Sequence, residues 1–319
     1  MRTKIFPSTT TLTFPISSGM TVAVSEFSSK IFATNVFGQL YIFNRKVVNL
    51  GSAKPPRISI QHVLPDRQLP LGGEFTTMAM IDCSRTAPKA YAKVSGQLIV
   101  MNTDTGEVTK TLPYPGLEFW RPRFSVDGSK VYVPFSNSIK VFSANNDTEL
   151  APIDVGAYFK NLLLSPDGKR LIAMGDHVAA IIETATGKVV SEHRTSFGDG
   201  WVSCISSDGK KVYIPTISDD GRSYIAVVDS SNLKEVGQIA GGGGGFMGDL
   251  FGGVASSPHH PFAVACDNHL MLIIDSRTDQ VVDAISMSGG VELMDVAIDK
   301  YLVSYVNASD KFVAARFYG

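Results

Sequence analysis

Cysteine is scarce in this chain, and the three that occur lie far apart. Cys83, Cys204 and Cys266 sit in separate apolar stretches, and no Cys-x-x-Cys pair is present. A disulfide framework and a zinc cluster both need more cysteines at closer spacing, so we expect neither. We expect three buried, reduced thiols, because a free cysteine usually behaves as a small apolar core residue.

An excess of charge and long hydrophobic runs are also missing. The chain has 29 basic and 30 acidic residues, for a net charge of −1. This balance gives no electrostatic basis for binding nucleic acid or an anionic membrane. No run approaches the ~18 apolar residues of a membrane helix, and the first residues contain no apolar signal-peptide core. We therefore expect a cytoplasmic protein with no nucleic-acid and no membrane partner.

Apolar residues, in contrast, are plentiful. They make up 44% of the chain and charged residues 18%, a balance that favours sheets buried on both faces. All-β propellers and barrels of this length often form one unit. We therefore expect a single domain over residues 1–319.

A repeated turn is the strongest feature of the sequence. Three Asp-Gly turns contain Asp127, Asp167 and Asp208, which are 40 and 41 positions apart. Each turn lies between two apolar runs, the pattern typical of a tight β-hairpin in which glycine accepts a positive φ. Each unit then continues through a third run and a second turn, as in residues 98–108 and 180–189. The repeat therefore predicts a four-stranded antiparallel blade of about 40 residues.

Counting these units predicts the architecture. The inner strands are expected to start near Thr21, Thr76, Arg121, Asn161, Val202, Val254 and Leu293. The last unit supplies three strands before Gly319, so its fourth is expected from the strand-like segments Lys4–Phe6 and Thr11–Ile16 near the N-terminus. The sequence thus predicts an all-β, seven-bladed β-propeller of four-stranded antiparallel blades. An N-terminal strand that joins the last blade would remove the exposed sheet edge.

The turn sequences also carry a family resemblance. Ser-Pro-Asp-Gly-Lys-Arg, followed by Thr-Gly-Lys-Val, resembles the YVTN-type bacterial propeller repeats of surface-layer-like and cytochrome-d1-like propellers, most clearly over residues 121–238. The resemblance implies the fold and no single activity, since that superfamily includes binding modules, lactonases, lyases and haem enzymes. No Cys-x-x-Cys-His haem-attachment site occurs, and we expect no cofactor.

The lengths of the connections predict two different faces. The first and third turns of each blade are short, and in a four-stranded blade they lie on the same face of the disc. The long connections all fall between blades, so they are expected on the opposite face, around the mouth of the central channel: residues 51–75, 114–120, 191–200 and 241–253. Long loops on a rigid scaffold commonly carry function.

Residues 241–253 form an unusual glycine-rich segment with three interpretations. A phosphate cradle is disfavoured, because the Gly-Lys-Ser/Thr ending of a P-loop is missing and no helix follows. A simple linker is one alternative. A lid is the other, in which Phe246, Met247, Leu250 and Phe251 close over an apolar ligand, with Asp249 among them.

A second cluster combines aromatic and basic residues at the starts of inner strands. Trp120 lies beside Arg121 and Arg123, a combination suited to binding a carboxylate or a planar ring. The alternative is an inter-blade ion pair between an arginine and Glu118 or another acid. The following blades place further residues at equivalent positions: Tyr158, Lys160, Asp199 and Trp201.

The histidines offer weaker candidates. His177 and His269 follow acidic residues in loops of the long-connection face, and His62 lies in the first long connection. Each is a candidate general base or a solvated loop histidine. His259 and His260 replace Asp-Gly in a short turn; adjacent side chains point apart, so we expect no metal site.

Two functions follow from these features. The first is a binding propeller whose long-loop face holds a small molecule or a protein or peptide partner. The alternative is a small-molecule enzyme at the same channel mouth, either a lyase or cyclase or a lactonase-type hydrolase. The polar candidates for either are Glu74, Arg121, Lys160, His177, Asp199, Asp249, His269 and Glu292.

Overall fold

A computed structural model of the chain defines its fold. It covers residues 12–15, 19–35, 39–48, 57–68, 80–94, 96–114, 120–195, 202–218, 221–240, 253–266, 270–286, 293–300, 302–308 and 311–316. Every regular element in these ranges is a β-strand. Among the residues covered, there is no helix that is long and apolar enough to cross a membrane.

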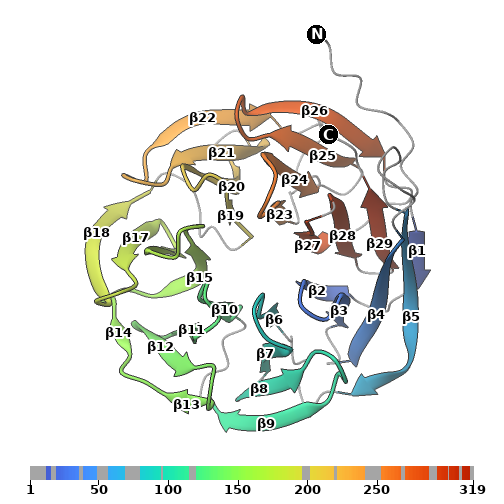
Figure 1. Ribbon diagram of the computed structural model, residues 1–319. Helices are drawn as coiled ribbons and strands as arrows, with labels where there is room; N and C mark the ends of the chain where they lie inside the picture. The colour runs from blue at the N-terminus through green and yellow to red at the C-terminus, as the bar shows by residue number, and fades with distance from the viewer. Residues whose placement is uncertain are drawn as a thin grey trace.

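The strands form seven antiparallel sheets, which follow one another around a ring (Figure 1). The first three sheets in chain order contain β2 (Gly19–Ser25), β3 (Lys30–Asn35), β4 (Gln39–Val48) and β5 (Arg57–Gln68); β6 (Met80–Cys83), β7 (Lys89–Val94), β8 (Gln97–Asn102) and β9 (Val108–Pro113); and β10 (Arg123–Phe124), β11 (Lys130–Phe135), β12 (Ser138–Ser143), β13 (Thr148–Glu149) and β14 (Ile153–Asp154). Both β13 and β14 pair with β12, so together they take the place of one outer strand.

The next three sheets repeat the same order. They contain β15 (Phe159–Leu164), β16 (Arg170–Gly175), β17 (Val178–Glu183) and β18 (Lys188–Arg194); β19 (Cys204–Ile205), β20 (Lys211–Ile217), β21 (Ser223–Asp229) and β22 (Glu235–Ala240); and β23 (Gly253–Ser256), β24 (Phe262–Cys266), β25 (Leu270–Asp275) and β26 (Gln280–Ser286). The prediction of an all-β propeller with four-stranded antiparallel blades is confirmed.

The last sheet combines both ends of the described chain. It contains β27 (Leu293–Ile298), β28 (Val303–Ala308), β29 (Lys311–Arg316) and the N-terminal strand β1 (Leu12–Pro15). β1 runs antiparallel to β29, with Leu12 opposite Ala314 and Phe14 opposite Phe312. Figure 1 shows β1 beside β29, next to the first sheet.

One predicted loop was wrong. Residues 51–75 were expected to be a long connection, but Arg57–Gln68 forms β5, the outer strand of the first sheet, and His62 lies within it opposite Phe43. Pro65 concealed the strand, because proline removes a backbone donor; an outermost strand tolerates this loss. Residues 191–194, expected in another connection, similarly extend β18.

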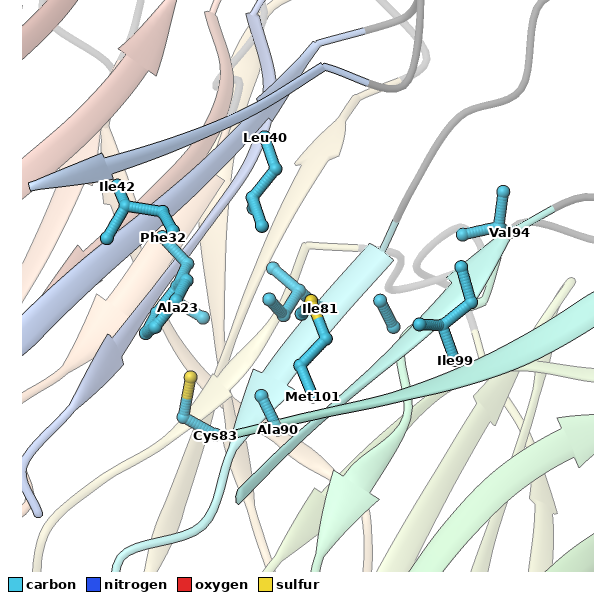
Figure 2. Packing of buried hydrophobic residues seen from close by; sticks show 11 residues of the cluster. Ala23, Phe32, Leu40, Ile42, Ile81, Cys83, Ala90, Val94, Ile99 and Met101 are labelled. Atoms are coloured by element: carbon cyan, nitrogen blue, oxygen red, sulfur yellow. The ribbon is translucent and has the colours of Figure 1, made fainter. Parts of the chain in front are cut away.

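The core lies between neighbouring sheets. Between the first two, Ala23 and Phe32 contact Ile81 and Ala90, and all four side chains are buried (Figure 2). Similar clusters fill most of the other intervals between sheets, because these strands carry apolar side chains on both faces. The three cysteines are reduced thiols buried within this core, as expected.

The Asp-Gly turns have the geometry that the sequence predicts. Gly128, Gly168 and Gly209 have φ values of 71°, 70° and 72°, a region that favours glycine. In the first of these turns, the Ser125 hydroxyl accepts a hydrogen bond from the Lys130 backbone N–H at 2.9 Å and donates to Asp127 at 2.5 Å. These bonds close the hairpin.

The short turns share one face of the ring, which we call the turn face. Within a sheet, the third turn donates a backbone hydrogen bond to the first: Thr103 N–H to the Pro88 carbonyl at 3.0 Å, and Ser230 N–H to the Lys210 carbonyl at 2.9 Å. The predicted pairing of first and third turns on one face is therefore confirmed.

The second turns and the connections between sheets meet on the opposite face, which we call the loop face. Val155 N–H donates to the Asn137 carbonyl at 3.1 Å, and Thr195 N–H donates to the His177 carbonyl at 3.0 Å. Each inner strand therefore begins at the loop face and ends at the turn face.

A repeated contact joins neighbouring sheets at the turn face. Lys211 Nζ lies 2.7 Å from an Asp279 carboxylate oxygen of the next sheet, and Tyr213 donates its hydroxyl to the other oxygen at 2.8 Å. Lys89 and Tyr91 contact Asp147 in the same way. Burial, followed by the hydrogen bond to Asp279, raises the pKa of Tyr213 well above its usual value.

Candidate functional site

A cavity of about 270 Å³ lies on the axis of the ring. All seven inner strands (β2, β6, β10, β15, β19, β23 and β27) contribute to its wall. Lys160 and Arg121 line it near the starts of their strands, and Ser207 and Pro258 line it near the turns. The cavity therefore extends from the loop face towards the turn face.

Arg121 reaches across the ring inside this cavity. Its guanidinium donates to the Asp295 carboxylate of the last sheet, and to the Thr21 hydroxyl of the first sheet at 2.6 Å. The same Asp295 oxygen accepts the Val22 backbone N–H at 2.7 Å. Of the two roles considered for this arginine, an ion pair between sheets is the one that the structure contains.

Arg123 points from the third sheet to the fourth. Its Nε donates to the Leu162 carbonyl at 2.9 Å, and a terminal nitrogen donates to the Asn161 side-chain oxygen at 3.3 Å. The Asn161 amide in turn donates to the Ser203 hydroxyl of the fifth sheet at 3.0 Å. Burial, and then the nearby Arg121 charge, lower the pKa of Arg123 to about 10.

Asp82 adds a carboxylate to the same wall. One of its oxygens accepts the Phe124 backbone N–H at 2.9 Å, which ties the second sheet to the third. Cys83 and Cys204 also line the cavity. Burial raises the pKa of both thiols, so they stay protonated and are poor nucleophiles at neutral pH.

The predicted aromatic and basic residues meet at the loop-face end of the cavity. Trp120 Nε1 donates to the Tyr158 hydroxyl at 2.9 Å, and the two rings are 6.0 Å apart at 71°. Lys160 Nζ lies 5.9 Å from the centre of the Trp120 ring, a cation–π contact. Because Lys160 also lines the cavity, this cluster lies at its mouth.

Of the other residues predicted at this mouth, only His177 is described, and it is not among the residues that line the cavity. His177 adopts a positive φ of 51° in a second turn, and its side chain is 65% exposed, with Nε2 3.7 Å from Asp176. It is therefore a solvated loop histidine. Eight more candidates lie outside the described residues: Glu74, Asp199, Trp201, Phe246, Asp249, Phe251, His269 and Glu292.

Sequence reasoning missed several cavity residues. Each inner strand ends at, or just before, a buried or half-buried polar residue: Ser25, Ser84, Ser125, Ser165, Ser206, Ser257 and Asp299. Counting back two positions from these reaches the missed Asp82 as well as the predicted Arg123, and counting back four reaches the missed Thr21, Asn161 and Asp295 as well as the predicted Arg121. When the repeat units are aligned on the polar residue at the end of each inner strand, these side chains stand out as polar at positions where the remaining units have apolar or small residues.

The described residues contain no cluster of three or more His, Cys, Asp or Glu side chains able to hold a metal ion. His260, a member of the adjacent pair, instead places Nε2 3.1 Å from the Lys300 carbonyl.

Comparison with known proteins adds no family assignment. No family model matches the chain, and no curated protein matches it. The propeller is therefore established by its strand pairing, and the site has to be interpreted from its own chemistry.

Proposed function

We propose that this chain is a ligand-binding β-propeller whose site is the axial cavity, reached from the loop face past Trp120, Tyr158 and Lys160. The observation that carries the proposal is the cavity itself, in which arginine, lysine and carboxylate groups converge among serine and apolar side chains. Ligand sites are typically concave, with convergent polar groups placed among apolar side chains. The YVTN-type repeat resemblance agrees with this function, as binding modules occur in that superfamily.

The size of the cavity favours a small molecule over a protein or peptide partner. Its volume of about 270 Å³ lies just below the ~300–1,000 Å³ range of pockets for drug-sized ligands. An enzyme at the same mouth, a lyase, cyclase or lactonase-type hydrolase, would need a general base. Among the described lining residues there is no histidine and both thiols are protonated, so a carboxylate such as Asp82 would have to serve as that base.

Blocking the cavity tests the proposal. Ala255 lines the cavity, whereas Val190 is exposed on the outer strand β18, so Ala255→Phe fills the site and Val190→Phe is a matched control. A defined library of amino acids, organic acids, sugars and nucleosides would be added in pools, and the melting temperature measured. A ligand that binds only the native state raises that temperature.

We expect at least one pool to stabilise the wild type and Val190→Phe but not Ala255→Phe. Circular dichroism checks that Ala255→Phe is folded; if it is not, the smaller Ala297→Val, on another lining strand, replaces it. The proposal is wrong if no pool stabilises the wild type, or if both folded variants respond equally.

A further inference from the structure

Two oppositely charged groups face the cavity without forming an ion pair. Asp82 belongs to β6 and Arg123 to β10, the inner strands of adjacent sheets, and both line the cavity. Within the described part of the chain, neither has an oppositely charged group within 4.0 Å. Among the described residues, the cavity thus contains the Asp82 carboxylate without a salt-bridge partner and two such guanidinium groups, of which Arg85 is exposed and Arg123 is enclosed.

The structure explains why these two groups do not pair with each other. The Phe124 N–H holds Asp82 between the second and third sheets, at 2.9 Å. The Leu162 carbonyl holds Arg123 between the third and fourth sheets, also at 2.9 Å. Each side chain is therefore fixed towards the sheet that follows its own, a preorganised arrangement that lowers the entropy cost of binding.

The other carboxylates of the cavity are already paired. Asp295 is bound by Arg121, and Glu26 lies 3.1 Å from Arg45 and 3.6 Å from Lys300. Among the described cavity residues, Asp82 is therefore a carboxylate without a cation in contact, and Arg123 is an enclosed cation without an anion in contact.

The charge of Arg123 is disfavoured where it lies. Burial and the Arg121 charge lower the pKa of Arg123 to about 10, and Asp82 offsets only part of this effect. An anion beside Arg123 would restore the favourable environment of its charge. An anionic group alone would also approach the Asp82 carboxylate, and a cation alone would approach Arg123, so a ligand with a single charge leaves one repulsive contact.

We propose that the cavity binds a small zwitterion of the amino-acid class, with its carboxylate on Arg123 and its ammonium group on Asp82. This inference rests on the proposed function and specifies its ligand. A guanidinium binds a carboxylate through two parallel N–H···O bonds, and a carboxylate accepts hydrogen bonds from an ammonium group. One molecule with both groups satisfies both side chains at once.

The direct test compares ligands that differ in one charge. The full-length protein would be titrated with each of the common L-amino acids, and the best binder with two derivatives: its N-acetyl form, which lacks the ammonium charge, and its carboxamide, which lacks the carboxylate. Calorimetry gives the dissociation constants. We expect one or more amino acids to bind, and each derivative to bind at least about tenfold more weakly.

Variants assign the two contacts. Asp82→Asn and Arg123→Gln each remove one charge, and each is expected to weaken binding of the amino acid at least about tenfold. Asp82→Asn should change the affinity for the N-acetyl derivative much less, since that ligand has no ammonium group to contact Asp82. The controls are Asp176→Asn in an exposed turn and Lys188→Met at an exposed position of β18, which should bind like the wild type.

The outcomes separate this inference from the proposed function. If the N-acetyl form or the carboxamide binds as well as the parent amino acid, the zwitterion assignment is wrong. The zwitterion assignment is also wrong if no amino acid binds while another library compound binds the wild type and fails to bind Ala255→Phe. In that case the proposed function would still stand. If nothing binds, both fail. The wild-type comparison of derivatives needs no variant, so misfolding of a variant leaves the test intact.

Discussion

The Arg121 guanidinium of the third sheet donates to the Asp295 carboxylate of the seventh, 174 positions later in the chain. The contact crosses the axis of the ring, and both side chains are largely buried, with 18% and 10% of their surface exposed. Asp295 also accepts the Val22 backbone N–H, so one carboxylate links three sheets. The pair therefore ties the last sheet to the first and third.

Arg121→Met is expected to destabilise the protein through Asp295. Removing one partner of a buried pair costs about 3–5 kcal/mol, and partial exposure reduces this to about 2 kcal/mol here. Urea unfolding measures the change. Asp295→Asn, added as a second substitution, removes the uncompensated charge, so the double variant should lose less stability than the sum of the single ones. Strict additivity would show that the two side chains are not coupled.

Asp279 is expected to be the most sensitive residue of the contact between the fifth and sixth sheets. It has a φ of 57° and accepts hydrogen bonds from Lys211 and Tyr213. Asp279→Ala combines backbone strain with the loss of charged hydrogen bonds, for about 3 kcal/mol. Asp279→Asn tolerates the positive φ and should cost less. Asp283→Ala, a surface substitution in β26, is the control and should stay within about 0.5 kcal/mol.

The stability of the protein is expected to fall in acid. A hydrogen bond from Ser125 lowers the pKa of Asp127, and one from Ser165 lowers that of Asp167. For Asp208, burial acts in the opposite direction but is outweighed by bonds from Ser206 and the Lys210 amide.

A lowered folded-state pKa contributes stability above the ordinary value of 3.8, and this contribution is lost as the pH falls through the folded-state pKa. The melting temperature should therefore change little between pH 7 and pH 5 and drop below about pH 4. The triple variant Asp127→Asn, Asp167→Asn, Asp208→Asn should show a shallower drop. An identical acid profile for the triple variant would rule out these turns as a source of the effect.

The N-terminal strand is expected to be needed for stability. β1 covers the edge of β29, which would otherwise expose unpaired backbone groups. Deleting residues 1–16 should lower the melting temperature sharply, and adding a peptide of residues 1–16 in excess should restore part of it by strand addition. An unchanged melting temperature after deletion would contradict this role.

The sequence was sufficient to predict the repeated parts of the fold. Asp-Gly turns have one physical explanation, a positive φ between two strands, so Gly128, Gly168 and Gly209 located the hairpins directly. β5 was missed for the opposite reason: Pro65 is unfavourable within a sheet, and only its position on the outermost strand makes it acceptable.

The site was less predictable, because its contacts join residues far apart in the chain. The cluster of Trp120, Tyr158 and Lys160 was found, since all three lie at the starts of adjacent inner strands. Nothing local connects Arg121 with Asp295, and the positions of Asp82 and Arg123 in their strands do not show which groups of the neighbouring sheets they contact. These relationships depend on how the sheets close into a ring.

The central claim, that the axial cavity holds a small molecule, is tested most directly by a crystal structure of the protein grown with the tightest-binding amino acid. The account predicts electron density in the cavity, with the carboxylate within hydrogen-bond distance of Arg123 and the ammonium group within hydrogen-bond distance of Asp82. Density for the ligand on the outer strands, with the cavity occupied only by water, would contradict it.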